Sequence, residues 1–253
     1  MTSFSFKYLE KVDSTNAYLL EMPEKERVGL VVFAREQTAG KGMASNVWES
    51  EPGENLTFSI GMDLSFMQAK DQFLLSQAVP LGMLDVLDTI VVGQTNRSAP
   101  TGMLSVKWPN DIVMDGQKLA GILINSTIHG KDMGVSVIGI GLNVNQMHFQ
   151  DWPTHPVSMK MILGKDVALD SLLDWLVAAV DQRIQLLRTA EGVVKIKEDY
   201  LRRLYRYHQW GLFETNEGTV KLFVDGIDEF GRLITLDEAG ASHVFDIKEI
   251  RFL

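Results

Sequence analysis

The pattern of apolar residues changes near residue 210, and this change constrains the fold more than any other feature of the sequence. Before it, apolar runs typical of buried strands alternate with helical stripes, of which the stripe over residues 169–187 is the clearest. After it come short alternating segments separated by glycines, the pattern of a small all-β barrel. We therefore predict an α+β domain over residues 1–209 and a β-barrel over residues 210–253.

The N-terminal part contains both strand and helix patterns. The predicted strands cover residues 28–34, 56–60, 106–108, 112–114, 119–124 and 135–144. The predicted helices cover residues 73–90, 169–187 and 193–207, and a loop is expected over residues 93–102. Asp115 and Gly116 stand between two of the short strands and predict a tight hairpin turn.

The composition argues against several classes of protein. A net charge of −9 without any basic run disfavours binding to DNA or RNA. The chain has no cysteine, which excludes disulfides, thiolate zinc sites and thioester chemistry. Its histidines lack metal-ligand spacing, so we expect no protein metal site. We find no signal peptide and no apolar run near ~20 residues, so we expect a cytoplasmic protein without a membrane span.

Two N-terminal segments could bind a ligand. Residues 13–16 (Asp-Ser-Thr-Asn) are by themselves typical of a helix N-cap. Residues 37–42 (Gln-Thr-Ala-Gly-Lys-Gly) have glycines at alternate positions, which let a backbone approach an anion closely. They match neither the Walker loop nor the dinucleotide fingerprint, which has a third glycine where this chain has Ser45. Alone, this segment is equally consistent with a flexible surface loop.

Three later segments carry similar signals. Residues 107–111 (Lys-Trp-Pro-Asn-Asp) place a cation, an amide and a carboxylate at a strand end that is broken by proline. Residues 118–123 (Lys-Leu-Ala-Gly-Ile-Leu) place a lysine at the start of an apolar strand that contains Gly121. Residues 138–145 (Gly139 and Gly141 among them) put glycines in a core strand, where they make room for a ligand or bend the strand.

Taken in this order, the five segments resemble the catalytic domain of biotin–protein ligases. Residues 226–231 (Gly-Ile-Asp-Glu-Phe-Gly) look like the SH3-like C-terminal domain of the same family, so the resemblance covers essentially the whole chain. It implies a class II synthetase-like fold, with helices on a mixed sheet, followed by a small SH3-like β-barrel. The implied activity joins biotin to AMP at the expense of ATP, then transfers biotin to a lysine of a biotin carboxyl carrier protein.

The resemblance also implies where the two substrates bind. The positions that match the biotin site are Ser14, Thr15, Asn16, Gln37, Gly40, Lys41, Gly42, Met43, Lys118 and Gly121. The positions that match the ATP site are Trp48, Lys107, Asn110 and Asn143.

The chemistry of the reaction suits these residue types. Lys118 and Lys41, with Mg²⁺, would screen the negative charges that meet when the carboxylate of biotin attacks the α-phosphate of ATP. Hydroxyl and amide groups suit the ring of biotin, which is polar but uncharged. Asp111 is our hypothesis for the group that deprotonates or orients the carrier lysine.

Two features depart from the family pattern. The glycine loop of the family usually reads Gly-Arg-Gly-Arg-x-Gly, whereas residues 40–45 here read Gly-Lys-Gly-Met-Ala-Ser. With one cation left in the loop, we predict weaker retention of the adenylate. Many bacterial members begin with a helix-turn-helix domain, whereas this sequence opens on the catalytic segments, so we expect no DNA binding. The sequence is compatible with a monomer or a homodimer.

Three other interpretations stay open at this point. A lipoate ligase or octanoyl transferase shares the fold class, although Lys-Trp-Pro-Asn-Asp is not expected in one. A non-catalytic protein that binds or senses biotin is suggested by the depleted glycine loop. A generic α/β fold with an interaction barrel would leave the five motifs as coincidence.

Overall fold

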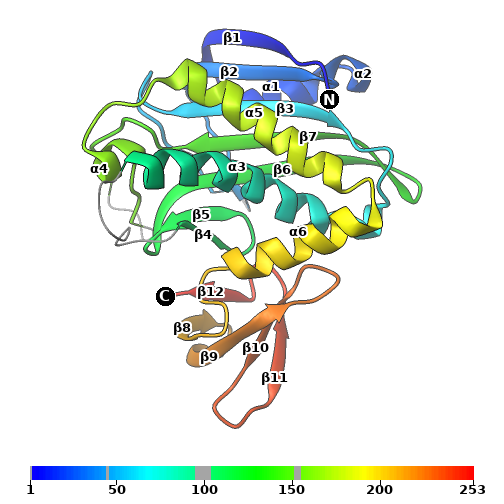
Figure 1. Ribbon diagram of the computed structural model, residues 1–253, viewed down its shortest axis with the longest axis vertical. Coiled ribbons are helices and arrows are strands. Elements are labelled where there is room, and N and C mark those ends of the chain that lie inside the picture. The colour runs from blue at the N-terminus through cyan, green and yellow to red at the C-terminus, as the bar shows by residue number, and fades with distance from the viewer. Residues whose placement is uncertain (1, 44–45, 95–103, 151–154) are drawn as a thin grey trace.

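The chain folds around two β-sheets, and the larger one carries the helices (Figure 1). The computed structural model describes residues 2–43, 46–94, 104–150 and 155–253. The larger sheet has the strand order β1-β2-β3-β7-β6-β5-β4; β1 and β2 run parallel, and the other neighbours run antiparallel. Its strands are β1 (Ser5–Val12), β2 (Leu30–Gln37), β3 (Leu56–Asp63), β4 (Leu104–Lys107), β5 (Asp111–Met114), β6 (Gln117–His129) and β7 (Asp132–Leu142).

Helices cover the two faces of this sheet unequally. Figure 1 shows α3, α5 and α6 across the face toward the viewer, with α1 behind the sheet. The helices are α1 (Thr15–Glu21), α2 (Glu24–Arg27), α3 (Phe73–Gln94), α4 (Met159–Leu163), α5 (Leu169–Leu186) and α6 (Ala190–Arg203), with a 3₁₀ turn η2 (Ala69–Asp71). The long helices occupy one face, and on the other face α1 packs against β2, β3 and β7.

The main core lies between the sheet and the long helices. The predicted stripe of α5 is buried there through Leu172, Leu176, Val180 and Ile184. Every residue of β3 from Leu56 to Met62 is buried, as expected for a central strand covered on both faces.

One helix qualifies the expectation about hydropathy. Residues 73–91 of α3 are long and apolar enough, by length and composition, to cross a membrane. This apolarity serves the core: 67% of the most apolar stretch of the helix is buried, and α3 packs against α5 and α6. The helix is apolar on most sides because it lies between the sheet and two other helices.

The second sheet follows the last helix. It is antiparallel with the order β11-β10-β9-β8-β12, which is consistent with the predicted SH3-like domain. Its strands are β8 (Trp210–Thr215), β9 (Gly218–Ile227), β10 (Leu233–Leu236), β11 (Ser242–Phe245) and β12 (Ile250–Phe252). The predicted fold class, a mixed sheet with helices followed by a small β structure, is confirmed.

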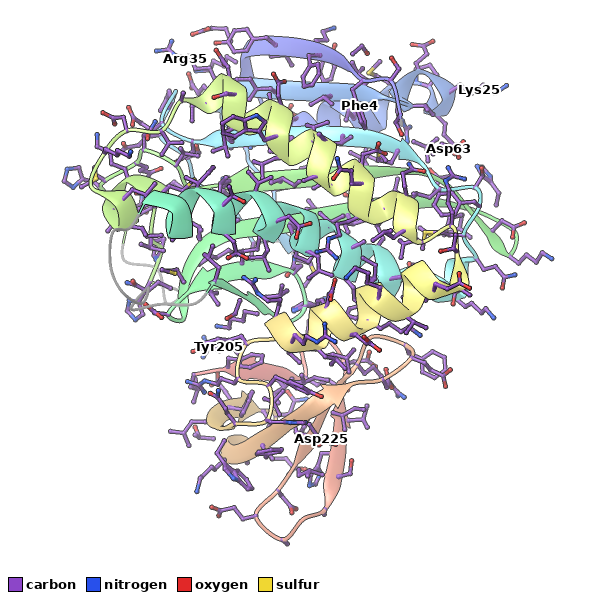
Figure 2. All side chains as sticks on the ribbon, in the orientation of Figure 1. Phe4, Lys25, Arg35, Asp63, Tyr205 and Asp225 are labelled. Carbon is purple, nitrogen blue, oxygen red and sulfur yellow. The ribbon has the colours of Figure 1, made fainter. Side chains whose placement is uncertain are left out.

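Specific contacts join the two sheets. Tyr205 marks where the chain leaves the helical layer (Figure 2), and its backbone N–H donates to the carbonyl of Val106 at 2.8 Å. The indole Nε1 of buried Trp108 donates to the carbonyl of Gly231 at 2.8 Å. Gly231 has φ +88, and a Cβ there would lie 2.3 Å from the ring of Phe73, so only glycine fits this close approach. Residues 107–111 are thereby held against the second sheet.

Each predicted strand and helix overlaps an observed one, but some limits were wrong. The helix expected over residues 193–207 is α6, Ala190–Arg203. The hairpin turn at Asp115 and Gly116 is confirmed, since both residues have positive φ, as a type I′ turn requires. The loop expected over 93–102 lies mostly outside the described residues; its first two residues belong to α3. Strand β1 was missed altogether.

Candidate active site

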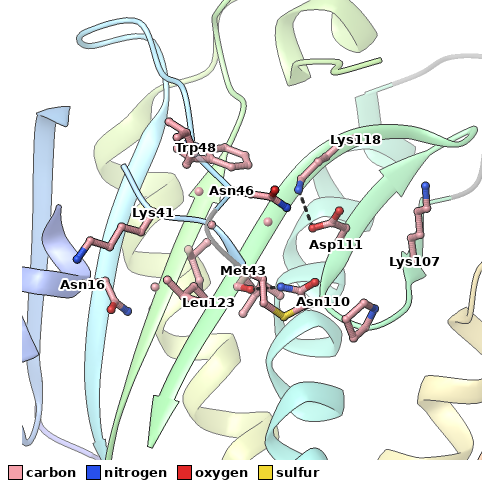
Figure 3. Close-up of a pocket in the computed structure, with 18 of the residues that line it drawn as sticks. Asn16, Lys41, Met43, Asn46, Trp48, Lys107, Asn110, Asp111, Lys118 and Leu123 are labelled. Carbon is pink, nitrogen blue, oxygen red and sulfur yellow. Dashed lines mark hydrogen bonds and ion pairs between the residues drawn. The ribbon is translucent and has the colours of Figure 1, made fainter. Parts of the chain in front are cut away.

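A cavity of about 270 Å³ opens on the face of the large sheet that α3 and α5 leave free (Figure 3). Twelve of the fourteen residues predicted from the sequence line it. They are Ser14, Thr15, Asn16, Gln37, Lys41, Gly42, Met43, Trp48, Lys107, Asn110, Lys118 and Gly121, joined by the proposed base Asp111. The structure therefore brings together segments that are more than one hundred residues apart in the sequence.

The start of α1 forms one end of the cavity. Ser14 is the N-cap of α1, as the helix-cap interpretation of this segment predicted. Its hydroxyl accepts a hydrogen bond from the N–H of Ala17. Gln37 Oε1 accepts from the backbone N–H of Thr15 at 2.7 Å and from its hydroxyl at 3.1 Å. The amide nitrogen of Asn16 is buried and has no hydrogen-bond partner. This end therefore offers uncharged polar groups, among them a donor that a ligand could satisfy.

The floor of the cavity is made of glycines on β6 and β7. Gly121 and Gly141 face each other across the two strands, and the ring of Trp48 lies over both. A Cβ on Gly141 would stand 2.3 Å from that ring, and one on Gly139 would stand 3.0 Å from Asn16 Nδ2. These glycines make room, so the bend-only alternative for this segment does not account for them.

Residues 40–42 pair with residues 46–48. The N–H of Trp48 donates to the carbonyl of Gly40 at 2.9 Å, and Lys41 forms a β-bridge with Val47. Gly40 does not line the cavity: it is buried, and a Cβ there would collide with the carbonyl of Trp48. Its missing side chain therefore serves the fold of the loop. Ser45, which stands where the family has a glycine, lies outside the described residues.

Lys118 and Asp111 form an ion pair at the centre of the cavity wall. Lys118 Nζ lies 2.8 Å from Asp111 Oδ1, and each side chain is about a quarter exposed. Figure 3 shows Lys118 pointing toward Asp111, with Lys107 on the neighbouring strand beyond it. Lys107 lies directly across from Asp111 in the β4·β5 pairing. Burial lowers the pKa of Lys107, and the nearby positive charges of Lys118, Arg206 and Arg251 lower it further, against the opposing effect of Asp111.

Asn110 and Asn143 are both held by backbone groups, but only Asn110 reaches the cavity. Asn110 Nδ2 donates to the carbonyl of Ile122, and Met43 lies beside Asn110 in Figure 3. Asn143 is 3% exposed and donates to the carbonyls of Lys118 and Val157 at 3.3 and 3.2 Å. Asn143 therefore lies outside the cavity lining, where it fixes the start of β6.

Sequence reasoning missed several lining residues. Asn46 and Leu123 lie close in sequence to the predicted residues Trp48 and Gly121. Ser59 is far from any predicted residue in sequence; its hydroxyl lies 2.8 Å from that of Thr15, and it was signalled only by strand alternation. The larger omission is a group from the second sheet: Ile247, Lys248, Ile250, Arg251 and Phe252. No local motif marks these residues, because their position depends on how the second sheet docks.

Among the described residues, no group of three or more His, Asp or Glu side chains is arranged to hold a metal ion. Asp111 is the single carboxylate among the described residues that line the cavity, and it is paired with Lys118.

The fold is that of biotin protein ligases. It is similar to the biotin protein ligase of Aquifex aeolicus solved in complex with biotin and ATP, with a TM-score of 0.78, 22% identity and coverage of 98% of each chain. The biotin protein ligase of Leishmania major in complex with biotin is also similar, with a TM-score of 0.65, 20% identity, and coverage of 96% of this chain and 98% of that one.

The chain belongs to the biotin/lipoate A/B protein ligase family, whose model matches residues 8–143. It is 30% identical over 238 residues to the biotin–(acetyl-CoA-carboxylase) ligase of Paracoccus denitrificans, covering 92% of this chain and 94% of that protein. It is 26% identical over 251 residues to the bifunctional ligase/repressor of Bacillus spizizenii, covering 94% of this chain and 71% of that protein.

Proposed function

We propose that the protein is an ATP-dependent biotin–protein ligase that forms biotinyl-5'-AMP and transfers biotin to a lysine of a biotin carboxyl carrier protein. The observation that supports this most is the shape of one cavity: an uncharged polar end at α1, a glycine floor, and the Lys118–Asp111 pair beyond it. Biotin consists of a neutral bicyclic ring, an aliphatic tail and a carboxylate. These three parts would meet the three environments in that order.

The residues would act on the reaction as follows. An oxygen of the biotin carboxylate attacks the α-phosphate of ATP, the bond to the β-phosphate breaks, and pyrophosphate leaves with the electron pair. Lys118 and Lys41 would offset the charge that builds up around the α-phosphate, and Mg²⁺, when bound to ATP, supplies further screening. Met43, together with the paired residues 40–42 and 46–48, would cover the mixed anhydride and exclude water.

The carrier lysine must lose its proton before it attacks the acyl carbon. Asp111 is the candidate group, because it lies in the cavity wall next to Lys118. In Asp111→Asn we expect transfer to the carrier to slow by at least about tenfold more than adenylate formation, because a general base typically contributes ~10²-fold or more. Single-turnover rates of the two steps check this. Equal loss in both steps would show that Asp111 only positions Lys118.

The arginine-poor loop predicts an adenylate that escapes more easily. Met43 stands where the family usually has an arginine, and it lines the cavity beside Asn110. In Met43→Arg we expect the release of biotinyl-5'-AMP to slow by about tenfold, the effect of one charge-assisted hydrogen bond of ~1.5 kcal/mol. Stopped-flow chase of the labelled adenylate measures the rate. An unchanged rate would contradict this account of the loop. Met161→Arg is the matched control, because Met161 on α4 is exposed and does not line the cavity.

Two assays distinguish this function from two alternatives, a lipoate ligase and a protein that only binds or senses biotin. The family model covers lipoate as well as biotin ligases, so binding of biotin and of lipoate should be compared directly. The similarity to the biotin–(acetyl-CoA-carboxylase) ligase of Paracoccus denitrificans favours biotin. A protein that only binds or senses biotin would release no pyrophosphate, whereas we expect release that depends on both biotin and ATP. Absence of that release with intact biotin binding would favour the sensor.

The wider setting follows from the same proposal. The partner would be the biotin carrier domain of a carboxylase, and the ligase would act in the cytoplasm as a monomer or a homodimer. We also propose that the two sheets define two domains divided at residue 210, where β8 begins.

A further inference from the structure

A second cavity, of about 660 Å³, lies in the second sheet and shares no described lining residue with the cavity of the candidate active site. It is bounded by residues 215–217 around the β8–β9 turn, by residues 237–239 at the β10–β11 turn, and by β11. Figure 1 shows the β10–β11 turn at the end of this sheet that points away from the helices. The volume of this second cavity lies within the usual range of ligand pockets, ~300–1,000 Å³, and the proposed function does not use it.

The second sheet has a free edge at this cavity. β11 and β12 are its two outermost strands, and within residues 155–253, all of which the structure describes, β11 pairs with β10 alone. The second cavity is lined by residues 243–245 of β11 and by Glu249, which precedes β12, so it extends from one edge strand toward the other. The backbone groups on the free side of β11 are therefore available to pair with another extended chain.

The edge strand β11 lacks the features that usually protect such an edge. Natural edge strands carry charged side chains, especially lysine, or proline. β11 reads Ser-His-Val-Phe over residues 242–245 and has neither. Val244 is 45% exposed, and Val220, Leu222 and Phe245 give the second cavity an apolar lining. A free edge beside an apolar pocket is the arrangement that binds peptides by strand addition, in which backbone hydrogen bonds hold the peptide and its alternate side chains enter the pocket.

The charge of the second cavity indicates which partner fits it. Four carboxylates line it, and among its described lining residues Lys221 is the single Lys or Arg. Lys221 is already paired with Glu238, at 2.7 Å. Residues 210–253 as a whole contain nine Asp and Glu and only four Lys and Arg. This charge favours a cationic partner, and it disfavours both a second copy of the same acidic edge and the phosphates of a nucleic acid.

The carboxylates of the second cavity differ in how far the fold uses them. Hydrogen bonds from His243 and from the N–H groups of Ala241 and Ala239 lower the pKa of Asp237, so this carboxylate stays ionised at neutral pH and shapes the β10–β11 turn. Glu217, in the β8–β9 turn, is exposed, and its carboxylate has no hydrogen bond or ion pair with any residue that the structure describes. Glu217 is therefore free to meet a cation of the partner.

We propose that the second cavity binds an extended, basic segment of a partner protein, which adds a strand along the free edge of β11. Alternate side chains of an extended chain point to opposite faces. A segment that alternates apolar and basic residues would therefore place its apolar side chains in the second cavity and its Lys or Arg side chains at the acidic rim. This site goes beyond the proposed function, since no residue of the candidate active site takes part in it.

The test is the fluorescence anisotropy of a labelled peptide, Lys-Leu-Lys-Leu-Lys-Leu-Lys, titrated with the full chain. We expect saturable binding to the wild type that is lost when the lysines of the peptide are replaced by glutamate. Replacing the central leucine with proline should weaken binding by at least about tenfold, because proline has no N–H to donate to the edge strand. A proline peptide that binds as tightly as its parent would refute strand addition.

Two variants of the protein, each with a matched control, locate the binding site. Val244→Lys puts a cation on the edge, and we expect it to weaken peptide binding by at least about tenfold. Its control is Val194→Lys on α6, where the valine is also exposed but lines neither cavity. Glu217→Gln should weaken binding by about two- to fivefold, the effect of one surface ion pair. Its control is Glu229→Gln, in the β9–β10 turn outside both cavities.

Three results would overturn the proposal. The first is a wild type that does not bind the peptide. The second is an equal loss in a variant and its matched control, since the peptide would then respond only to the net charge of the protein. The third is a dimer of the chain alone, seen by sedimentation, that Val244→Lys dissociates and Val194→Lys does not, because the edge of β11 would then belong to a second copy.

Discussion

Replacing Lys118 with alanine is expected to lower the rate of biotinyl-5'-AMP formation by about 10²- to 10³-fold, the usual effect of removing one preorganised donor from a charge-stabilising site. Lys118 is suited to this part because its Nζ lies in the cavity wall, 5.7 Å from the ring centroid of Trp48 and 2.8 Å from Asp111. The measurement is single-turnover adenylate formation at saturating biotin and ATP.

The loss should appear in the chemical step and not mainly in the affinity for biotin. Biotin's ring would bind at the α1 end, through groups that the substitution does not touch. Lys160→Ala is the matched control, since Lys160 also pairs with an aspartate, Asp166 at 2.7 Å, but does not line the cavity. If Lys118→Ala forms the adenylate at a rate within about threefold of the wild type, Lys118 has no part in the chemical step.

The second large effect is expected from adding one methyl group to the floor of the cavity. In Gly141→Ala the new Cβ would stand 2.3 Å from the ring of Trp48, closer than any real contact, so Trp48 must move into the space that biotin would use. Overpacking of this kind costs ~1–3 kcal/mol, which corresponds to about 5- to 150-fold weaker biotin binding. Equilibrium binding of biotin, followed by the fluorescence of the tryptophans, measures it.

Gly226→Ala is the control for this substitution. Gly226 lies in β9, and a Cβ there would meet nothing within 4 Å. It should bind biotin normally. If Gly141→Ala also binds biotin normally while remaining folded, then Trp48 does not rest on the glycine floor in the ligand-binding state, and our account of the floor is wrong.

The sequence could predict most of the cavity because each segment marks a place where a strand or helix ends or loses its side chains. Residues 107–111 lie where β4 turns into β5, and Gly121 and Gly141 meet because β6 and β7 are antiparallel neighbours in that register. The local pattern therefore predicts the site residues that neighbouring strands bring together.

The sequence is a poorer guide to residues whose position depends on burial or on the docking of the second sheet. Strand β1 was missed because its apolar residues Phe6 and Tyr8 lie on an exposed face at the edge of the sheet, about half exposed. Asn143 has the residue type of a ligand contact, but its amide is used to hold backbone carbonyls. Lys248 and Arg251 reach the cavity only through the docking of the second sheet, which no short motif records.

The most direct test of the central claim is the mass of a biotin carrier domain after incubation with the protein, ATP, Mg²⁺ and biotin. We predict that the carrier gains the mass of one biotinyl group on a single lysine, that pyrophosphate appears in step with it, and that omission of ATP abolishes both. An unmodified carrier, with a protein that is folded and binds biotin, would contradict the assignment of this cavity as the site of a biotin–protein ligase.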